Sequence, residues 1–440
     1  MEQKKNTRRK FVKQTTMASA GIVLAPSLKS NAMYNIFNEK KLKVALVGCG
    51  GRGSGAANQA LQADDNIELV AMADAFEDRL LTSYDNLYEK YKDSGKVKVK
   101  EKNRFVGFDA YKKAIDLADV VILATPPGFR PTHFAYAVEQ GKHVFMEKPV
   151  ATDVPGIQKV LKYAREASNK NLKVVVGLQR RYQENYLAVL EQIKKGVVGK
   201  LVGGQVYWNS AGVWVRPRKP EYTELEYQMR NWYYFNWLCG DHILEQHIHN
   251  IDVANWFLDE FPVSAQGMGG RQVRTGKEHG EIFDHHFVEF TYPSGAVISS
   301  QCRHQPGTYN RVAEQFQGTK GFVNTNDAAA ALIYDLEGNE IAKLESSEGH
   351  NPYQEEHNRL FKAIRENSVL NNAEYGAKST LTAIMGRMAT YSGEVITWDD
   401  AIKSTHQIVP DEMTWDTPPP VMPKPDGYYE IPTPGKTKVL

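Results

Sequence analysis

The feature that most constrains this chain is a glycine-rich turn that directly follows a short apolar run. Residues 44–47 read Val-Ala-Leu-Val, which is typical of a buried strand in a parallel sheet. The turn carries Gly48, Gly50 and Gly53 in the spacing G-x-G-x-x-G, and residues 54–61 have a composition compatible with a helix. This order of elements predicts a dinucleotide site, with the pyrophosphate at the helix N-terminus.

Each glycine has its own predicted role. Gly48 permits the tight turn, Gly50 lets the backbone approach the pyrophosphate, and Gly53 lets the helix pack close to the strand. A second apolar run, residues 67–73, ends at Asp74, about 20 residues after Gly53, where a ribose-binding carboxylate is expected. Because a carboxylate there would repel a 2′-phosphate, we predict NAD as the cofactor. A tight turn without a ligand is the alternative.

Length and composition indicate a globular protein of two domains. The chain has 440 residues, of which 42% are hydrophobic and 24% charged. Its net charge of +2 argues against a dedicated nucleic-acid-binding protein, which would carry a strongly basic domain. Three scattered cysteines are too few for a disulfide framework or a four-cysteine zinc site.

Residues 1–32 are predicted to be an export signal. A basic start is followed by a mild apolar run at residues 17–26 and a small-residue site at residues 30–32. Residues 7–13, Thr-Arg-Arg-Lys-Phe-Val-Lys, resemble the twin-arginine signal, which exports folded proteins, often with cofactor already bound. This predicts a periplasmic protein that carries its nucleotide along. The apolar run is too short for a stable membrane anchor, so none is expected after signal removal.

Residues 41–178 are predicted to form a Rossmann domain, with a doubly wound parallel sheet. Short apolar runs alternate there with amphipathic segments, as in βαβ units. Arg79, shortly after Asp74, is expected to line the adenine side, and the lysine-rich residues 85–105 are expected to be a solvated helix and loop. The predicted strands are residues 44–47, 67–73, 120–124, 143–146 and 174–178.

Several motifs that resemble those of a known family follow the third predicted strand. The motifs there are Thr125-Pro126-Pro127, His133, Ala137, Gly141-Lys142-His143-Val144 and Glu147-Lys148-Pro149. With the glycine turn, they resemble the Gfo/Idh/MocA oxidoreductases, which include glucose–fructose oxidoreductase and inositol dehydrogenases, over most of residues 42–405. The predicted cofactor-binding residues are Gly48, Gly50, Gly51, Arg52, Gly53, Asp74, Arg79, Thr125, Pro126, His133, Glu147, Lys148 and Gln179.

Lys148 is also singled out by its position. It follows the apolar residues 143–146, at the carboxyl edge where open α/β sheets bind ligands. A lysine there can donate a proton to a substrate hydroxyl or remove one. We therefore predict a catalytic role, with a plain surface lysine as the alternative. In the resembling family a cis peptide often precedes this proline and aims the lysine inward.

Residues 179–417 are predicted to form an α+β substrate and oligomerisation domain with a large open, mainly antiparallel sheet, as the resemblance also implies. Amphipathic helices within residues 353–405 are expected to pack back on the first domain, with Gly393 as a helix C-cap. The proline-rich residues 418–440 are expected to be an arm over a neighbouring subunit or unstructured. The predicted strands are residues 201–208, 285–292, 296–303 and 330–335.

An aromatic insertion at residues 209–257 is predicted to contact a sugar. Rings with polar neighbours suit sugar faces, although any single ring could instead be packing. The predicted substrate-binding residues are Arg181, Tyr182, Trp232 and His247.

Within the insertion, residues 242–252 are predicted to form one helix with a polar stripe. His242, Glu245, His249 and Asp252 would lie on one face of such a helix. The resembling family places an acid and a histidine four residues apart here, as D-x-G-x-H, which assigns these places to Glu245 and His249, with His247 in place of glycine. The predicted catalytic residues are Lys148, His249 and Glu245. No metal is expected, and the pair at residues 285–286 and His304 are predicted to be strand-end or loop histidines.

Together, these sequence features predict an exported NAD-dependent oxidoreductase that acts on a sugar, glycoside or polyol and forms a homodimer or homotetramer. His249 would be the base, Lys148 would stabilise the developing alkoxide, and Glu245 would orient His249 or hold a second hydroxyl. Which of Lys148 and His249 carries the proton stays open. Two alternatives also stay open: a glycoside hydrolase that uses NAD for transient C3 oxidation and elimination, and a non-catalytic sugar-binding protein. Arg52 and the insertion are the predicted clamp on the nucleotide.

Overall fold

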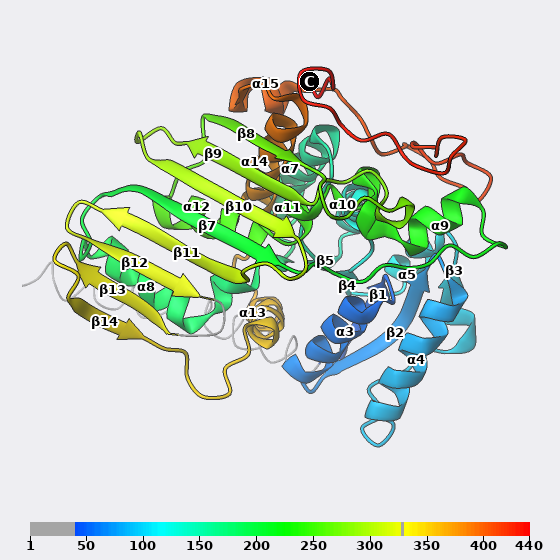
Figure 1. The fold of residues 1–440 in the computed structure, drawn as a ribbon. Coiled ribbons are helices and arrows are strands. Elements are labelled where there is room, and N and C mark those ends of the chain that lie inside the picture. Colours follow the sequence, from blue (N-terminus) through cyan, green and yellow to red (C-terminus); the bar gives the residue numbers. More distant parts are fainter. Residues whose placement is uncertain (1–39, 327–329) are drawn as a thin grey trace, which may run out of the picture.

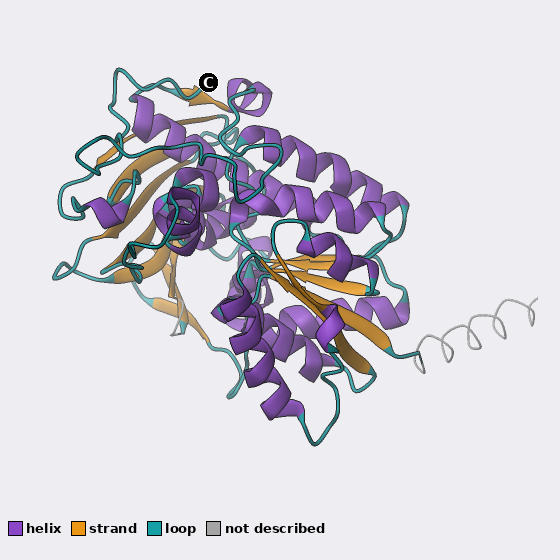
Figure 2. Cartoon of the chain, turned by 90° about the vertical axis from the view of Figure 1, so that its right-hand side faces the viewer, coloured by secondary structure: helices purple, strands orange, loops and turns teal. Residues whose placement is uncertain are grey.

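The computed structural model describes residues 40–326 and 330–440, so the predicted export signal lies outside the described residues. The first domain is a six-stranded parallel sheet in the order β3-β2-β1-β4-β5-β6, with helices on both faces (Figures 1 and 2). Its strands are β1 (Leu42–Val47), β2 (Ile67–Asp74), β3 (Arg104–Val106), β4 (Val120–Leu123), β5 (His143–Met146) and β6 (Val174–Val176). Its helices are α3 (Gly51–Ala63), α4 (Glu77–Tyr91), α5 (Ala110–Asp116), α6 (Arg130–Glu139) and α7 (Val154–Asn169).

This sheet confirms the predicted Rossmann arrangement, and the five predicted strands are all present. The one strand of this sheet that the sequence did not predict is β3, which begins at the end of the lysine-rich stretch expected to be a helix and loop. It has three residues and pairs only with β2, at the edge of the sheet. So short an edge strand carries no hydrophobic period that could identify it.

The second domain is built on a nine-stranded sheet in the order β14-β13-β12-β11-β7-β10-β9-β8-β15. Neighbouring strands are antiparallel except for β7 and β10, which are parallel, so the predicted mainly antiparallel sheet is confirmed. The strands are β7 (Leu201–Ser210), β8 (Ser264–Gly270), β9 (His285–Thr291), β10 (Val297–His304), β11 (Arg311–Gly318), β12 (Gly321–Asn326), β13 (Ala331–Asp335), β14 (Glu340–Leu344) and β15 (Ile396–Thr397).

Helices cover only one face of this large sheet. Buried and half-buried side chains alternate along β9 and β10, which shows that one face packs on the core. The helices on that face are α8 (Glu184–Lys194), α12 (Ile248–Leu258) and α14 (Ala373–Ser392). In the described residues, no helix lies over the other face, which points toward the viewer in Figure 1.

The last helices join the two domains. Helix α13 (Pro352–Glu366) packs against α3, and α14 packs against both α7 and β8. Gly393 closes α14 in the left-handed conformation, with φ of 76°, and its N–H donates to the carbonyl of Ala389, which confirms the predicted C-cap. A short helix, α15 (Trp398–Lys403), follows.

The helix predicted for residues 242–252 is broken, so that prediction is wrong. The insertion contains α9 (Glu224–Arg230), α10 (Asn236–Cys239) and α11 (His242–Glu245), and α12 begins only at Ile248. The two residues at the break make distant polar contacts: Gln246 meets His304 at 2.7 Å, and His247 meets Ser300 at 2.7 Å. These contacts replace the regular helical path, and Glu245 and His249 therefore belong to different helices.

The proline-rich tail packs against its own chain, which corrects the expected arm or unstructured end. Tyr429 is buried, its hydroxyl donates to Glu224 at 2.5 Å, and its ring meets Phe235 edge-on. The tail runs along the top of the molecule, past α9 (Figure 1). None of the helices in residues 40–326 and 330–440 is both long and apolar enough to span a membrane.

Candidate cofactor and active site

The glycine turn has the geometry that the sequence predicted. Gly48 has φ of 94°, and a Cβ there would lie 2.5 Å from the carbonyl carbon of Ala124. A Cβ on Gly53 would lie 1.9 Å from the carbonyl oxygen of Gly48. By contrast, a Cβ on Gly50 would meet nothing within 4 Å, because this residue faces open space at the start of α3. The turn and packing roles of Gly48 and Gly53 are thus confirmed, and Gly50 leaves room for an anion.

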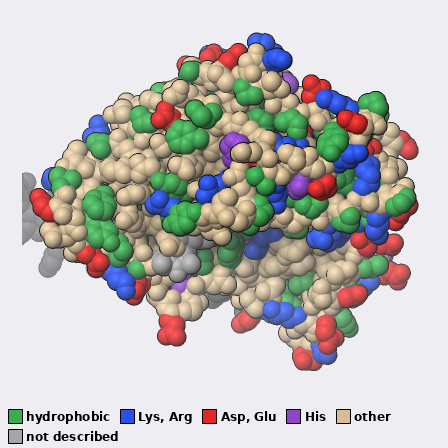
Figure 3. Space-filling view, viewed as in Figure 1, with side chains coloured by type: hydrophobic (Ala, Val, Ile, Leu, Met, Phe, Trp, Pro, Cys, Tyr) green, Lys and Arg blue, Asp and Glu red, His purple; other side chains and the backbone are tan. Residues whose placement is uncertain are grey.

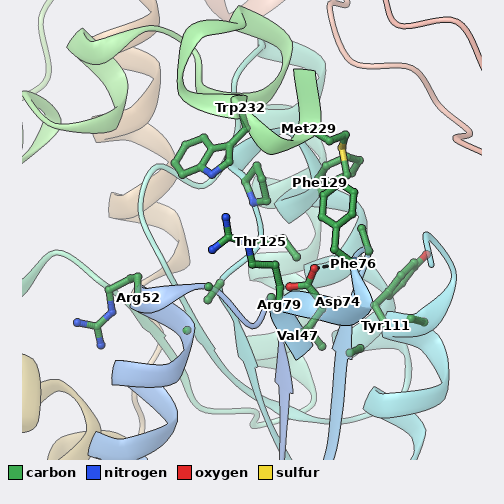
Figure 4. A pocket seen from close by; sticks show the side chains of 18 of the residues that line it. Val47, Arg52, Asp74, Phe76, Arg79, Tyr111, Thr125, Phe129, Met229 and Trp232 are labelled. Carbon is green, nitrogen blue, oxygen red and sulfur yellow. Dashed lines mark hydrogen bonds between the residues drawn. The ribbon is translucent and has the colours of Figure 1, made fainter. Parts of the chain in front are cut away.

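A cavity of about 390 Å³ opens above this turn. Figure 4 shows Asp74 and Thr125 pointing into it from the ends of β2 and β4, which lie on either side of β1, with Trp232 above them. The cavity brings together ten of the predicted cofactor residues: Gly48, Gly50, Gly51, Arg52, Gly53, Asp74, Arg79, Thr125, Pro126 and His133. A glycine turn, a helix N-terminus and a carboxylate at the tip of β2 fit the pyrophosphate and ribose of a dinucleotide.

Asp74 is held in place by the backbone around it. Its carboxylate accepts hydrogen bonds from the N–H of Cys49 at 2.6 Å and from that of Phe76 at 2.9 Å. Burial raises the pKa of Asp74, while these two N–H groups and the charge of Arg79 act in the opposite direction. Both oxygens retain lone pairs, so the carboxylate can still accept from ribose hydroxyls.

His133 also lines the cavity, as a neutral ring. It lies 3.3 Å from the hydroxyl of Thr125 through Nδ1 and stacks on Tyr111 with ring centroids 4.1 Å apart. Burial lowers the pKa of His133 to about 3, and the nearby charge of Arg130 adds to the effect. A neutral imidazole between apolar rings is suited to line a nucleotide pocket.

The aromatic insertion covers the cavity, which is where the sequence placed the clamp. Trp214, Arg216, Met229, Arg230 and Trp232 line it from above. The structure therefore places Trp232 over the cavity, and its contact with substrate stays a prediction. The sequence named the insertion as a whole, but only the structure identifies which of its side chains face the cavity.

Arg230 fastens this cover to the first domain. Its guanidinium donates to the Asp78 carboxylate at 3.1 and 3.2 Å and lies 4.0 Å from the centre of the Phe76 ring. From the segment just before the proline-rich tail, Trp415 packs on the rings of Phe76, at 5.4 Å, and Phe108, at 4.8 Å. Three segments far apart in the sequence thus close one rim of the cavity.

The remaining predicted cofactor residues, Glu147, Lys148 and Gln179, are not among the residues that line this cavity. Arg52 pairs through Nε with the buried Glu147 at 2.9 Å and lies under the ring of Tyr353 at 5.2 Å. Gln179 is buried and borders a second cleft, which Tyr353 also lines. Glu147 therefore acts on the cavity through Arg52.

Lys148 and Glu245 meet although they are 97 residues apart. The Lys148 ammonium donates to the Glu245 carboxylate at 3.1 Å and also to the Glu245 backbone carbonyl. Burial raises the pKa of Glu245, and the charge of Lys148 acts against that rise. The Lys148–Pro149 peptide is cis. Glu245 thus holds Lys148, whereas the sequence had predicted that it orients His249 or a substrate hydroxyl.

The positive charge of Lys148 also acts on His249. Burial lowers the pKa of His249 well below its usual value, and the charge of Lys148 lowers it further. The imidazole stacks on Trp208 with ring centroids 5.8 Å apart, and its Nδ1 has no hydrogen-bond partner among the described residues. It is therefore neutral at pH 7 and able to accept a proton.

Three predicted substrate residues are engaged elsewhere. Arg181 forms a paired ion bridge with Asp252, at 2.8 and 2.9 Å. Tyr182 is buried, and its hydroxyl donates to Asn372 at 2.6 Å. His247 is fully buried beneath the large sheet. These contacts assign all three side chains to packing, which corrects their predicted contact with substrate.

Two family models match this chain, one in each of its two domains. Residues 42–177 match the oxidoreductase family model with an NAD-binding Rossmann fold, GFO/IDH/MocA, and residues 186–324 match the C-terminal domain of that family. The chain belongs to the Gfo/Idh/MocA family of oxidoreductases. The predicted family and the predicted NAD cofactor are thereby confirmed, and the first domain of this family member is its NAD-binding domain.

Relatives match part of this sequence, and solved structures share its fold. An inositol 2-dehydrogenase of Rubrobacter xylanophilus is 26% identical over 231 residues, which cover 52% of this chain and only 58% of that relative. The aldose-aldose oxidoreductase from Caulobacter crescentus, complexed with glycerol, has a TM-score of 0.64 at 19% identity and covers 81% of this chain and 100% of its own. Levoglucosan dehydrogenase, in complex with NADH and levoglucosan, has a TM-score of 0.62 at 17% identity, covering 81% and 99%.

Proposed function

We propose that this protein transfers a hydride between NAD and a hydroxyl-bearing carbon of a sugar, glycoside or polyol. The observation that carries the proposal is a lysine at the carboxyl edge of the NAD-binding sheet, Lys148, held by Glu245, together with a buried neutral imidazole, His249, within its electrostatic reach. A neutral imidazole and an ammonium group are the pair that oxidation of an alcohol requires. The inositol 2-dehydrogenase relative and the sugar-related structural neighbours support a polyhydroxylated substrate.

Each side chain has a distinct part in this reaction. His249 removes the hydroxyl proton, because its low pKa keeps the ring unprotonated. Lys148, fixed by the Glu245 carboxylate and carbonyl, donates to the substrate oxygen and stabilises its developing negative charge. Glu245 positions Lys148. When bound, NAD would supply the hydride acceptor, and the glycine turn and Asp74 are the residues that would hold its pyrophosphate and ribose.

The test is reduction of the nucleotide by a panel of polyols, free sugars and glycosides, followed by NADH absorbance. Lys148→Ala and His249→Ala should each lower turnover about 10²–10⁴-fold. Lys142→Ala and His285→Ala are the matched controls, because these two residues lie outside the site, and they should turn over as the wild type does. Wild-type turnover in both active-site variants would refute the assignment.

The same assay separates the other functions that the sequence left open. Release of an aglycone without net NADH would replace the dehydrogenase proposal with the redox-assisted glycoside hydrolase. Sugar binding without turnover of any substrate would replace it with the binding protein.

We further propose that the protein is exported to the periplasm and that it keeps its NAD throughout the reaction cycle. The twin-arginine-like residues 7–13 support export, and the cover formed by the insertion and Trp415 supports retention. A second carbonyl substrate would then reoxidise the nucleotide. Fractionation of expressing cells tests the location: finding the full-length protein in the cytoplasm would refute export.

Retention is measured by denaturing the purified protein and quantifying the released nucleotide. The Arg230 contacts are partly exposed, so Arg230→Ala should cost about 1 kcal/mol and speed NAD release about fivefold. Lys219→Ala is the control in the same insertion, since Lys219 is exposed. A wild-type protein that purifies without nucleotide and depends on added NAD would refute retention but leave the hydride-transfer proposal standing.

A homo-oligomer is also proposed, as a dimer or tetramer. The helix-free face of the large sheet supports it, because apolar side chains are exposed on its strands, Met268 and Val297 among them. Figure 3 shows apolar side chains at several places over this face. Light scattering coupled to gel filtration tests the proposal: a monomer at micromolar concentration would refute it.

A further inference from the structure

A cluster of buried polar side chains lies beneath β9 and β10, and the proposed hydride transfer makes no use of it. It consists of Asp241, directly before α11, His242 at the start of α11, His286 in β9 and His304 at the end of β10. All four side chains are almost completely buried. The sequence predicted the two strand histidines to lie at strand ends or in loops, with no metal site, so their burial around one carboxylate is a finding of the structure.

Hydrogen bonds define which nitrogen of His286 carries the proton. His286 Nδ1 lies 2.9 Å from the Thr390 hydroxyl, and that hydroxyl donates its own hydrogen to the carbonyl of Arg387. Thr390 can therefore only accept from His286, so Nδ1 is the protonated nitrogen and Nε2 carries a lone pair. That Nε2 is buried, and it has no hydrogen-bond partner among the described residues.

The lone pair of His286 faces a negative charge. Its Nε2 lies 3.2 Å from Oδ2 of Asp241. The same carboxylate accepts from the backbone N–H of Phe283 at 3.0 Å and from the Tyr391 hydroxyl at 2.5 Å, which stabilises it in its ionised form. Two acceptors at this distance, shielded from water, repel each other unless a cation lies between them.

His242 shows the same arrangement on the other side of Asp241. Its Nδ1 lies 2.7 Å from Oδ1 of Asp241, and its buried Nε2 has no hydrogen-bond partner in the described part of the chain. The His242 ring lies 4.8 Å from that of His286 and stacks at 4.4 Å on that of His304. A histidine with one nitrogen fixed by an oxygen and the other left bare is the usual form of a metal ligand.

We propose that Asp241, His242 and His286 form a structural site for a zinc-type divalent metal ion. One ligand atom of each residue lies within 4.8 Å of the others. The 3.2 Å between Asp241 and His286 is close to the ligand–ligand edge of roughly 3.3 Å in a tetrahedron with bonds of about 2.0–2.1 Å. Two imidazoles and a carboxylate suit zinc and its neighbours among the divalent transition metals. The hydroxyl oxygen of Tyr391, next to the Asp241 carboxylate, is placed to be a fourth metal ligand.

Such an ion would fix the helix that serves the active site. Helix α11 begins at His242 and ends at Glu245, whose carboxylate and carbonyl hold Lys148. His304, stacked on His242, reaches Gln246 at 2.7 Å, immediately after Glu245. The ion would therefore stabilise the position of Lys148 from below without touching substrate or cofactor.

The experiment is a metal analysis of the full-length protein, purified without metal-affinity chromatography, by mass spectrometry. We expect about one ion per chain, and after removal by a chelator the protein should take up Zn²⁺, or Co²⁺ with visible d–d absorption. His286→Ala should abolish uptake, whereas His285→Ala should not, because His285 is partly exposed and bound to Asp284. Thr390→Val removes the acceptor behind His286, together with the hydrogen bond from that hydroxyl to the carbonyl of Arg387, and should weaken metal affinity about 10–100-fold.

Two results would overturn the proposal. One is a folded wild-type protein that takes up no stoichiometric Zn²⁺ or Co²⁺ after chelator treatment, in which case a proton on His286 is the cation. The other is full metal uptake by a folded His286→Ala variant. If that variant does not fold, the wild-type stoichiometry and the Thr390→Val affinity decide. All these readouts are independent of hydride transfer, so failure of the proposed activity would leave them intact.

Discussion

Replacing Gly50 with alanine should separate cofactor binding from folding. The backbone of Gly50, with φ of −74° and ψ of −178°, is one that alanine adopts readily, and a new Cβ would meet nothing within 4 Å. The free energy of unfolding should therefore change by no more than about 1 kcal/mol, since a slightly poorer N-cap opposes a stiffer unfolded chain. The added methyl would instead occupy the space through which the pyrophosphate reaches the N-terminus of α3.

The expected loss of affinity follows from the hydrogen bonds that the methyl would lengthen. Each hydrogen bond to a charged group contributes about 1.5–3 kcal/mol, so losing one weakens NAD binding about 10–100-fold. Isothermal titration of nucleotide-free protein with NAD measures this affinity, and urea denaturation of the same samples measures stability.

Two neighbouring glycines provide the controls. Gly55→Ala lies within α3, where the new methyl makes ordinary contact with Arg52, and it should stabilise the protein by about 0.5–1 kcal/mol without altering NAD affinity. Gly53→Ala must shift the turn, because its Cβ would lie 1.9 Å from the carbonyl oxygen of Gly48, so stability and affinity should fall together. Wild-type NAD affinity in Gly50→Ala would refute the placement of the pyrophosphate.

Three further predictions concern stability. Arg180→Met leaves the buried carboxylate of Glu314 without its cation and should cost about 3–5 kcal/mol in urea denaturation; a cost below about 1 kcal/mol would contradict it. Asp153→Ala removes the N-cap of α7 and the acceptor for the N–H groups of Ile408 and Val409, so it should cost about 1–2 kcal/mol and speed proteolysis of residues 404–440. Burial raises the pKa of Glu281 from 4.5 to about 7, so the folded state keeps this carboxyl protonated at a pH where the unfolded chain has lost the proton. The free energy of unfolding should therefore fall by about 3 kcal/mol as the pH rises from about 5 to about 7. Glu281→Gln should remove that slope when unfolding is measured at pH 5 and pH 8, and an unchanged slope would exclude Glu281 as its source.

The sequence was sufficient for the features that depend on neighbouring residues. Strand, turn and helix around Gly48 and Gly53 follow from local periodicity and from conformations that only glycine tolerates, and the structure shows both constraints. The order of elements along the chain, together with the Glu147-Lys148-Pro149 motif, predicted a Rossmann domain followed by a mainly antiparallel sheet. The same reasoning missed β3, which has too few residues to show a pattern, and in the second domain it named β7, β9, β10 and β13 but not β8, β11, β12, β14 or β15.

Predictions from the local sequence pattern were wrong where a side chain makes its polar contacts with a residue distant in the sequence. Helical spacing put Glu245 and His249 on one helix, but contacts from Ser300 and His304 break that helix between them. Arg181 and Tyr182 follow the strand that ends the first domain, a position that suggested substrate, yet Asp252 and Asn372 take their polar atoms.

What the sequence alone determined is the fold class, the nucleotide and the edge of the sheet where it binds, because each is encoded within a few dozen consecutive residues. Only the tertiary structure decided that the insertion covers the cofactor through Arg230 and Asp78, that Glu245 holds Lys148, and that Asp241 is surrounded by buried histidines. Arg230 and Asp78 are 152 residues apart, and such pairings depend on how two domains pack together, which no local period records.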